Sequence, residues 1–84
     1  MGSVTYYVAM AFERDEEGEL VALEPMESQT STAAVSRARA LAASHAGAVA
    51  FSRTGDPEIG EFADAVLLFS AGEVPTDIAA LAGR

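Results

Sequence analysis

The sequence contains no cysteine, no lysine and no tryptophan, and its single histidine is His45. Without cysteine the chain has no disulfide, no thiolate ligand for a metal and no cysteine nucleophile. A lone histidine also excludes a zinc site of the usual histidine and cysteine type. No stretch approaches the roughly 20 apolar residues that a membrane span requires. We therefore predict no metal and no cofactor.

Charge of one sign is also scarce, because five arginines stand against 13 acidic residues and leave a net charge of −8. Such a surface repels phosphate groups, so we expect no nucleic-acid binding and no binding to an anionic membrane. A basic partner protein or a cation stays open as a binding partner. The sequence favours a simpler interpretation, in which the acids keep an apolar-rich domain soluble.

The chain has 84 residues, half of them hydrophobic, which is a high share for a domain with so little interior. We expect one α+β domain over residues 1–84, with residues 1–3 disordered or left over from cloning. Apolar surface that cannot be buried inside favours an oligomer, and we expect a homodimer.

Two pairs of strands flank one helix in the sequence pattern. Residues 4–12 and 19–27 are rich in β-branched, aromatic and aliphatic residues, and an acidic segment ending at Gly18 joins them. Pro25 predicts that the second strand lies at an edge or is bulged. Residues 48–54 and 62–70 form the second pair of predicted strands.

The segment 28–47 has helical spacing, with a predicted inward stripe made of Val35, Ala38, Leu41, Ala42 and His45. Its candidate N-caps are Ser28, Thr30, Ser31 and Thr32. Gly47 is predicted to end the helix in the left-handed conformation. A short second helix is predicted over residues 75–83. The predicted fold is therefore ββαββ(α), a single antiparallel sheet of about four strands with one long helix on one face and a short C-terminal helix.

Both faces of the predicted sheet are apolar. In the first strand Tyr7 and Ala9 point to one side, Val8 and Met10 to the other. One helix covers one face, so we expect a second copy of the chain to cover the other. The candidate interface residues are Tyr7, Ala9, Val21, Leu67 and Phe69.

The stretch "FSRTGDPEIGEF", residues 51–62, gathers four charged residues between two phenylalanines. Asp56, Glu58 and Glu61 offer oxygen ligands to a hard cation, but their spacing does not match an EF-hand loop. The pattern favours a turn instead, because Asp56-Pro57 starts turns and Gly55 and Gly60 permit positive φ. Should a ligand bind here, the candidate residues are Tyr6, Arg53 and Asp56.

Motifs for catalysis are missing: the sequence has no GxSxG, no GxGxxG and no phosphate-binding loop. Our leading hypothesis is a non-enzymatic, self-associating protein-interaction module, with no catalytic residue. The alternative is a small-molecule or cation-binding domain with its site near residues 53–61. An enzyme using Glu58 and Glu61 is the least favoured hypothesis, since it requires a dry pocket.

Taken together, "YYVAMAFERDEEGELV", the central helix opened by serine and threonine, and "GAVAFSRTGDPEIGEFADAVLLFSAGEVP" resemble a family of small bacterial proteins with no assigned activity. The similarity extends from about Thr5 to Pro75, and "AFSRTGDPEIGEF" is its most specific part. The resemblance implies a cytoplasmic protein. The resemblance does not identify any functional residue in this sequence.

Overall fold

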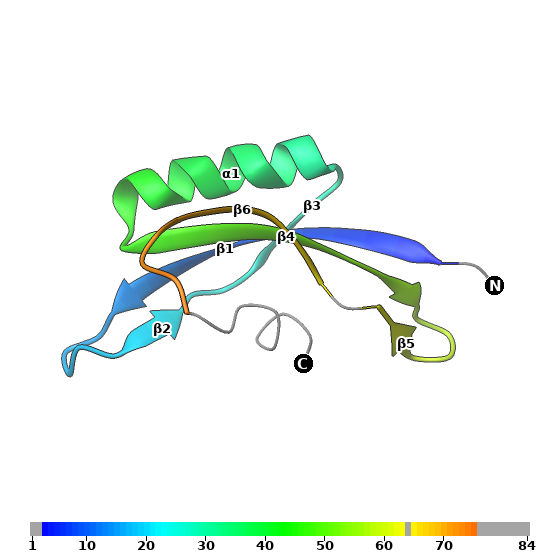
Figure 1. The fold of residues 1–84 in the computed structure, drawn as a ribbon, viewed down its shortest axis with the longest axis horizontal. Coiled ribbons are helices and arrows are strands. Elements are labelled where there is room, and N and C mark those ends of the chain that lie inside the picture. Colours follow the sequence, from blue (N-terminus) through cyan, green and yellow to red (C-terminus); the bar gives the residue numbers. More distant parts are fainter. Residues whose placement is uncertain (1–2, 64, 76–84) are drawn as a thin grey trace.

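The structure, a computed structural model, describes residues 3–63 and 65–75. A curled antiparallel sheet carries a single helix across one face in this part of the chain (Figure 1). The predicted α+β class is confirmed, whereas the short helix predicted at the C-terminus lies outside the described residues. The elements are β1 (Val4–Arg14), β2 (Leu20–Ala22), β3 (Met26–Ser28), α1 (Ser31–Ser44), β4 (Gly47–Asp56), β5 (Glu61–Phe62) and β6 (Val66–Gly72).

Two long strands, β1 and β4, form the centre of the sheet. They are antiparallel, and their register runs from Val4 opposite Gly55 to Phe12 opposite Gly47. The outer edge of β1 pairs with both β2 and β3, and the outer edge of β4 pairs with both β5 and β6. Over the described residues the sheet is therefore four strands wide although it contains six strands.

The predicted number of strands was wrong because two of the predicted strands are interrupted. The first interruption lies at residues 23–25, between β2 and β3. There Pro25 has no N–H to donate to a ladder, while the N–H of Leu23 still donates to the carbonyl of Ala11 at 2.9 Å. The second interruption separates β5 from β6. The prediction that Pro25 marks an edge strand is confirmed.

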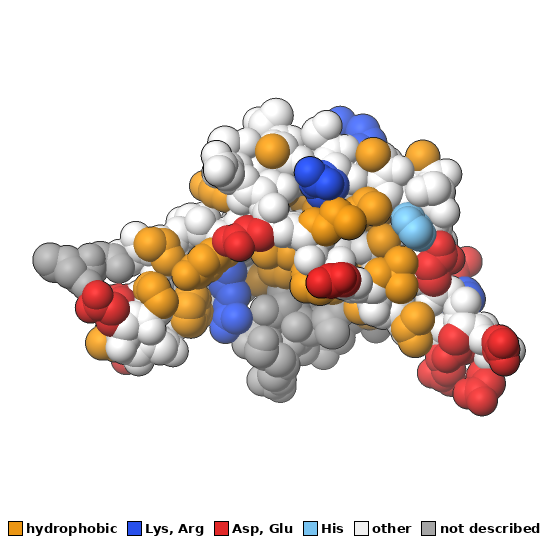
Figure 2. Space-filling model, turned by 180° about the vertical axis from the view of Figure 1, so that it is seen from behind, with side chains coloured by type: hydrophobic (Ala, Val, Ile, Leu, Met, Phe, Trp, Pro, Cys, Tyr) orange, Lys and Arg blue, Asp and Glu red, His pale blue; other side chains and the backbone are white. Residues whose placement is uncertain are grey.

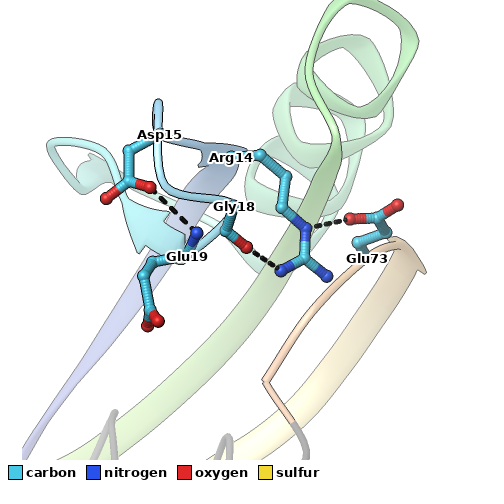
Figure 3. A network of polar contacts seen from close by, with 5 residues as sticks. All are labelled: Arg14, Asp15, Gly18, Glu19 and Glu73. Atoms are coloured by element: carbon cyan, nitrogen blue, oxygen red, sulfur yellow. Dashed lines mark hydrogen bonds and ion pairs between the residues drawn. The ribbon is translucent and has the colours of Figure 1, made fainter.

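The turn between β1 and β2 is held by one aspartate. Oδ1 of Asp15 accepts hydrogen bonds from the N–H groups of Glu17 and Glu19, at 2.9 and 2.8 Å (Figure 3 shows the second). Gly18 takes a φ of +83°, a conformation that favours glycine. The sequence therefore makes a tight hairpin here although four of the five residues from Asp15 to Glu19 are acidic.

Arg14 connects this hairpin to the far edge of the sheet (Figure 3). Its Nη1 donates to the carbonyl of Gly18 at 2.6 Å, and its Nε donates to the carboxylate of Glu73, just after β6, at 2.8 Å. Both charged side chains are about half exposed, so the ion pair stabilises the fold by at most about 1 kcal/mol. Its clearer consequence is that the negative charge beside the end of β6 is neutralised within the chain.

Helix α1 begins at a threonine cap and ends without a glycine. Oγ1 of Thr30 accepts a hydrogen bond from the N–H of Ala33 at 3.0 Å. At the other end His45 is extended, and its Nδ1 lies 2.5 Å from Oε2 of Glu13. The predicted left-handed Gly47 was wrong, because this residue already belongs to β4. Glycine is required there for space, since a Cβ would lie 2.0 Å from the carbonyl oxygen of Glu73.

Replacing the cap residue, Thr30→Ala, is expected to lower the free energy of unfolding by about 1 kcal/mol, because the Ala33 N–H loses its partner at the helix start. Urea denaturation followed by circular dichroism measures this change. The matched control is Thr32→Ala, a threonine that is exposed inside the first turn. Equal losses in the two variants would contradict the capping role of Thr30.

Two apolar layers lie on opposite faces of the sheet. The layer under the helix consists of small side chains, namely Ala9, Ala34, Ala38, Ala48 and Ala50. The layer on the other face, which we call the back face, consists of large ones, namely Met10, Phe12, Val49 and Phe51. Alanine on both elements lets α1 lie close to the sheet, as the alanine-rich stripe predicted.

The back face is buried at its centre within a single chain. Phe12 is only 1% exposed, and Val8, Leu20, Ala65 and Val74 pack around this layer. The centre of the back face therefore needs no second copy to cover it, and the homodimer stays a prediction. Any surface left for a partner must lie at the ends or the edges of the sheet.

The ends of the sheet are less covered than its centre for a geometric reason. A helix of 14 residues is about 21 Å long, whereas the 11 residues of β1 extend over about 36 Å. The hairpins therefore project past the helix (Figure 1). Burial follows this arrangement, since residues 9–12 of β1 are buried while Val4 and Thr5 are exposed.

Candidate functional site

The hairpin between β4 and β5 forms the stretch that the sequence singled out. Oδ1 of Asp56 accepts a hydrogen bond from the N–H of Glu58 at 3.0 Å, and its backbone carbonyl accepts from Gly60 at 2.9 Å. Gly60 has a φ of +73°. The predicted turn is confirmed, and its aspartate is engaged in holding the turn itself.

Gly55 has a different role from the one predicted. Its φ is not positive, and it lies opposite Phe62 in the ladder between β4 and β5. A Cβ at this position would lie 2.3 Å from the Phe62 ring and 2.4 Å from the Glu61 carbonyl oxygen. Glycine is therefore needed because an aromatic ring packs directly onto the backbone, a known way to support glycine in sheets.

Next to this glycine, three side chains from three strands gather on the back face at the end of the sheet. Tyr6 of β1 lies opposite Arg53 of β4. The guanidinium carbon of Arg53 lies 4.9 Å from the centre of the Phe62 ring, and the rings of Tyr6 and Phe62 lie 6.1 Å apart. Stacking of arginine on an aromatic face contributes about 0.5–1 kcal/mol at an exposed site. The arrangement holds the β5 hairpin onto the sheet.

The structure thus brings together two of the three predicted ligand-binding residues. Tyr6 and Arg53 are neighbours, while the carboxylate of Asp56 belongs to the turn. Sequence reasoning missed Phe62, which contacts both. The signal that points to Phe62 is Gly55 within a strand pattern, because a glycine there often indicates close approach of another group.

Three hollows on the described part of the chain are open grooves of about 470–500 Å³ rather than enclosed cavities. One runs between α1 and β6, one lies beside Tyr6 and β3, and one lies beside the turn at Asp56. Within the described residues, no three histidine, cysteine or acidic side chains come close enough to hold a metal ion. None of these grooves supplies the dry setting that a catalytic carboxylate pair requires.

The predicted interface residues divide between the interior and the edges. Ala9 is fully buried beneath the helix, and Tyr7 and Phe69 pack against the same layer. Phe69 also lies under Arg39 of the helix, whose guanidinium carbon is 5.1 Å from the ring centre. The reason is that α1 covers the face of β1 that we had assigned to a second copy. Only Val21 and Leu67 are exposed, at opposite edges of the sheet.

The edge formed by β2 and β3 carries both apolar and acidic side chains. Val21, Leu23 and Met26 are exposed along it, and Glu24 and Glu27 are interspersed among them. In Figure 2 the acidic side chains gather most densely at one end of the molecule, where the β1–β2 hairpin lies. Negative charge therefore accompanies the apolar surface on this edge.

The opposite edge, formed by β5 and β6, has exposed apolar side chains, together with exposed Glu58 and Glu61 at its β5 end. Ile59 in the turn is 64% exposed, and Val66 and Leu67 at the start of β6 are 58% and 49% exposed. The strand β6 contains no charged residue. The start of β6 therefore exposes two successive large apolar side chains in a strand without charge.

Comparisons with protein-family models, with curated proteins and with solved structures found no match to the chain. In the described ranges, no helix has the length and apolar character needed to cross a membrane. The family resemblance and the cytoplasmic location stay predictions from the sequence.

Proposed function

We propose that the protein is a non-enzymatic, cytoplasmic interaction module whose first partner is a second copy of itself. The observation that carries this proposal is the exposure of Val66 and Leu67, successive residues at the start of β6. Neighbouring large apolar side chains with about half of their surface exposed are characteristic of contact surfaces. A chain of 84 residues is also only marginally stable alone, so association contributes to its stability.

Charge decides which kind of partner fits this edge. Two copies with a net charge of −8 repel each other, and a contact between them must lie where acidic side chains are few. Within the β5–β6 edge, the strand β6 meets this requirement, since it contains no charged residue. The acidic β1–β2 hairpin and the β2–β3 edge suit a basic protein as a further partner instead. A small-molecule or cation site near residues 53–61 is less well supported, because Asp56 is engaged in its own turn.

Light scattering after size exclusion tests the proposal. The expected mass rises from monomer to dimer as the protein concentration increases through the micromolar range. Higher salt is expected to strengthen the dimer, because screening reduces the repulsion between two acidic copies while leaving apolar contacts in place. A monomer at every concentration and salt level, with a melting temperature independent of concentration, would remove the proposal.

A further inference from the structure

We infer that two copies pair through the outer edge of β6, as antiparallel strands about a two-fold axis near Ser70, so that two sheets join into one. This inference rests on the proposed self-association and specifies its geometry. The two long edges of the sheet differ in a way that selects β6. Antiparallel pairing about a two-fold axis is self-complementary, since each strand supplies both donors and acceptors.

The β2–β3 edge has the features by which natural sheets avoid pairing. Each of its strands has three residues, Pro25 lies between them, and Glu24 and Glu27 are exposed along it. Short strands, proline and charge are the usual protections of an edge. In contrast, β6 runs for seven residues without charge or proline. Its irregularities are a bulge opposite the Ala50–Phe51 step of β4 and the positive φ of Gly72 at its end, which leave the segment from Phe69 to Ala71 regular.

The register of β6 shows which backbone groups face outward. The N–H of Glu73 donates to the carbonyl of Ala46. Bonded pairs alternate along an antiparallel ladder, so Ala71 and Phe69 exchange hydrogen bonds with β4 at Ala48 and Ala50. Ser70, opposite Val49, therefore directs its N–H and C=O away from β4. No strand pairs with this side of β6 among the described residues.

The surroundings of β6 are less negative than the rest of the chain. Glu73, just after the strand, is already paired with Arg14 at 2.8 Å. On the helix side, Arg39 lies over the ring of Phe69. A second copy therefore meets no uncompensated acid along the regular half of the strand, whereas a basic peptide finds no acid there to bind. These charges favour a second copy as the occupant of this edge.

Cysteine cross-linking tests the geometry, since the chain has no cysteine of its own. Two Ser70 residues that exchange hydrogen bonds across the axis have Cα atoms about 5.5 Å apart, within the range that a disulfide spans. We expect Ser70→Cys to form a covalent dimer on mild oxidation at concentrations where the wild type is dimeric. The matched control is Ala22→Cys, an exposed residue on the opposite edge, which is expected to cross-link at least tenfold more slowly.

A charge substitution gives a second, independent readout. Ser70→Lys changes the net charge from −8 to −7, so it weakens the general repulsion between copies. At the proposed axis it places two ammonium groups side by side, and we expect at least a tenfold weaker dimer. Ala22→Lys makes the same change in net charge and is expected to leave the dimer unchanged or slightly tighter.

The outcomes separate this inference from the proposed function. A wild type that never dimerises overturns both. A wild type that dimerises, with Ser70→Cys cross-linking no faster than Ala22→Cys and Ser70→Lys behaving like Ala22→Lys, overturns only the pairing through β6. Circular dichroism of each variant shows that it remains folded, and a Ser70→Lys variant that unfolds leaves the cross-linking comparison as the deciding measurement.

Discussion

Phe12→Ala is expected to lower the free energy of unfolding by about 3–5 kcal/mol, one of the two largest losses among the substitutions considered for this protein. Phe12 is 1% exposed and is one of the two largest fully buried side chains. Its removal takes away apolar contact and leaves a cavity among Met10, Val49 and Phe51, whose backbone positions are fixed by the central ladder. Urea denaturation followed by far-ultraviolet circular dichroism measures the change.

Such a loss is a large part of the total stability, which for a chain of this length is about 4–13 kcal/mol. A Phe12→Ala variant that is largely unfolded at 25 °C is consistent with the expectation. Phe12→Leu keeps most of the volume and is expected to fold with an intermediate loss. The control is Phe62→Ala, which removes the same side chain from a partly exposed position at the end of the sheet. A loss below 1 kcal/mol for Phe12→Ala would show that the back face is not a true core.

The two faces of β1 show which part of the packing could be predicted from the sequence. The alternation in β1 correctly separated Tyr7 and Ala9 from Val8 and Met10, because side chains alternate strictly along a strand. Which set meets the helix does not follow from that pattern, since both sets are apolar. The structure places the smaller side chains under α1, where a close approach requires them, and the larger ones on the back face.

Breaks within strands were harder to predict than the strands themselves. Pro25 was recognised as an edge signal, yet the two short strands around it keep separate registers with β1. The sequence pattern does not show that the N–H of Leu23, between the two short strands, still donates a hydrogen bond to β1. At the second break the register against β4 shifts by one residue, because β5 pairs Phe62 with Gly55 and β6 pairs Val66 with Ser52. Such a shift is a property of the pairing and not of either segment alone.

The glycines also show which structural features the sequence pattern does not predict. Gly18 and Gly60 have the positive φ that turn chemistry predicts. Gly47 and Gly55 do not, and each is required because a distant segment approaches its backbone: Glu73 in one case, Phe62 in the other. When a distant segment contacts the backbone in this way, the only sign of that contact in the sequence is the glycine itself. The Tyr6–Arg53–Phe62 cluster was incompletely predicted for this reason.

The alanine layer between helix and sheet makes the second strong prediction. Ala38 is fully buried in a cluster whose other fully buried members are also alanines, which lets the helix lie close to the sheet. Ala38→Leu inserts three carbons where no space exists, and the helix must move outward or the side chain must adopt a strained rotamer. We expect a loss of about 1–3 kcal/mol, and each kcal/mol lowers the melting temperature of a domain of this size by about 4–8 °C.

The control for this prediction is Ala40→Leu, two residues further along the same helix at an exposed position. Alanine and leucine have similar helix propensities, so the two variants differ mainly in what the new side chain meets. Ala40→Leu is therefore expected to change stability by less than about 0.5 kcal/mol. Equal stabilities for the two variants, measured by thermal melting at one fixed concentration, would mean that the helix is not closely packed on the sheet. In that case the small side chains of Ala9, Ala48 and Ala50 would need another explanation.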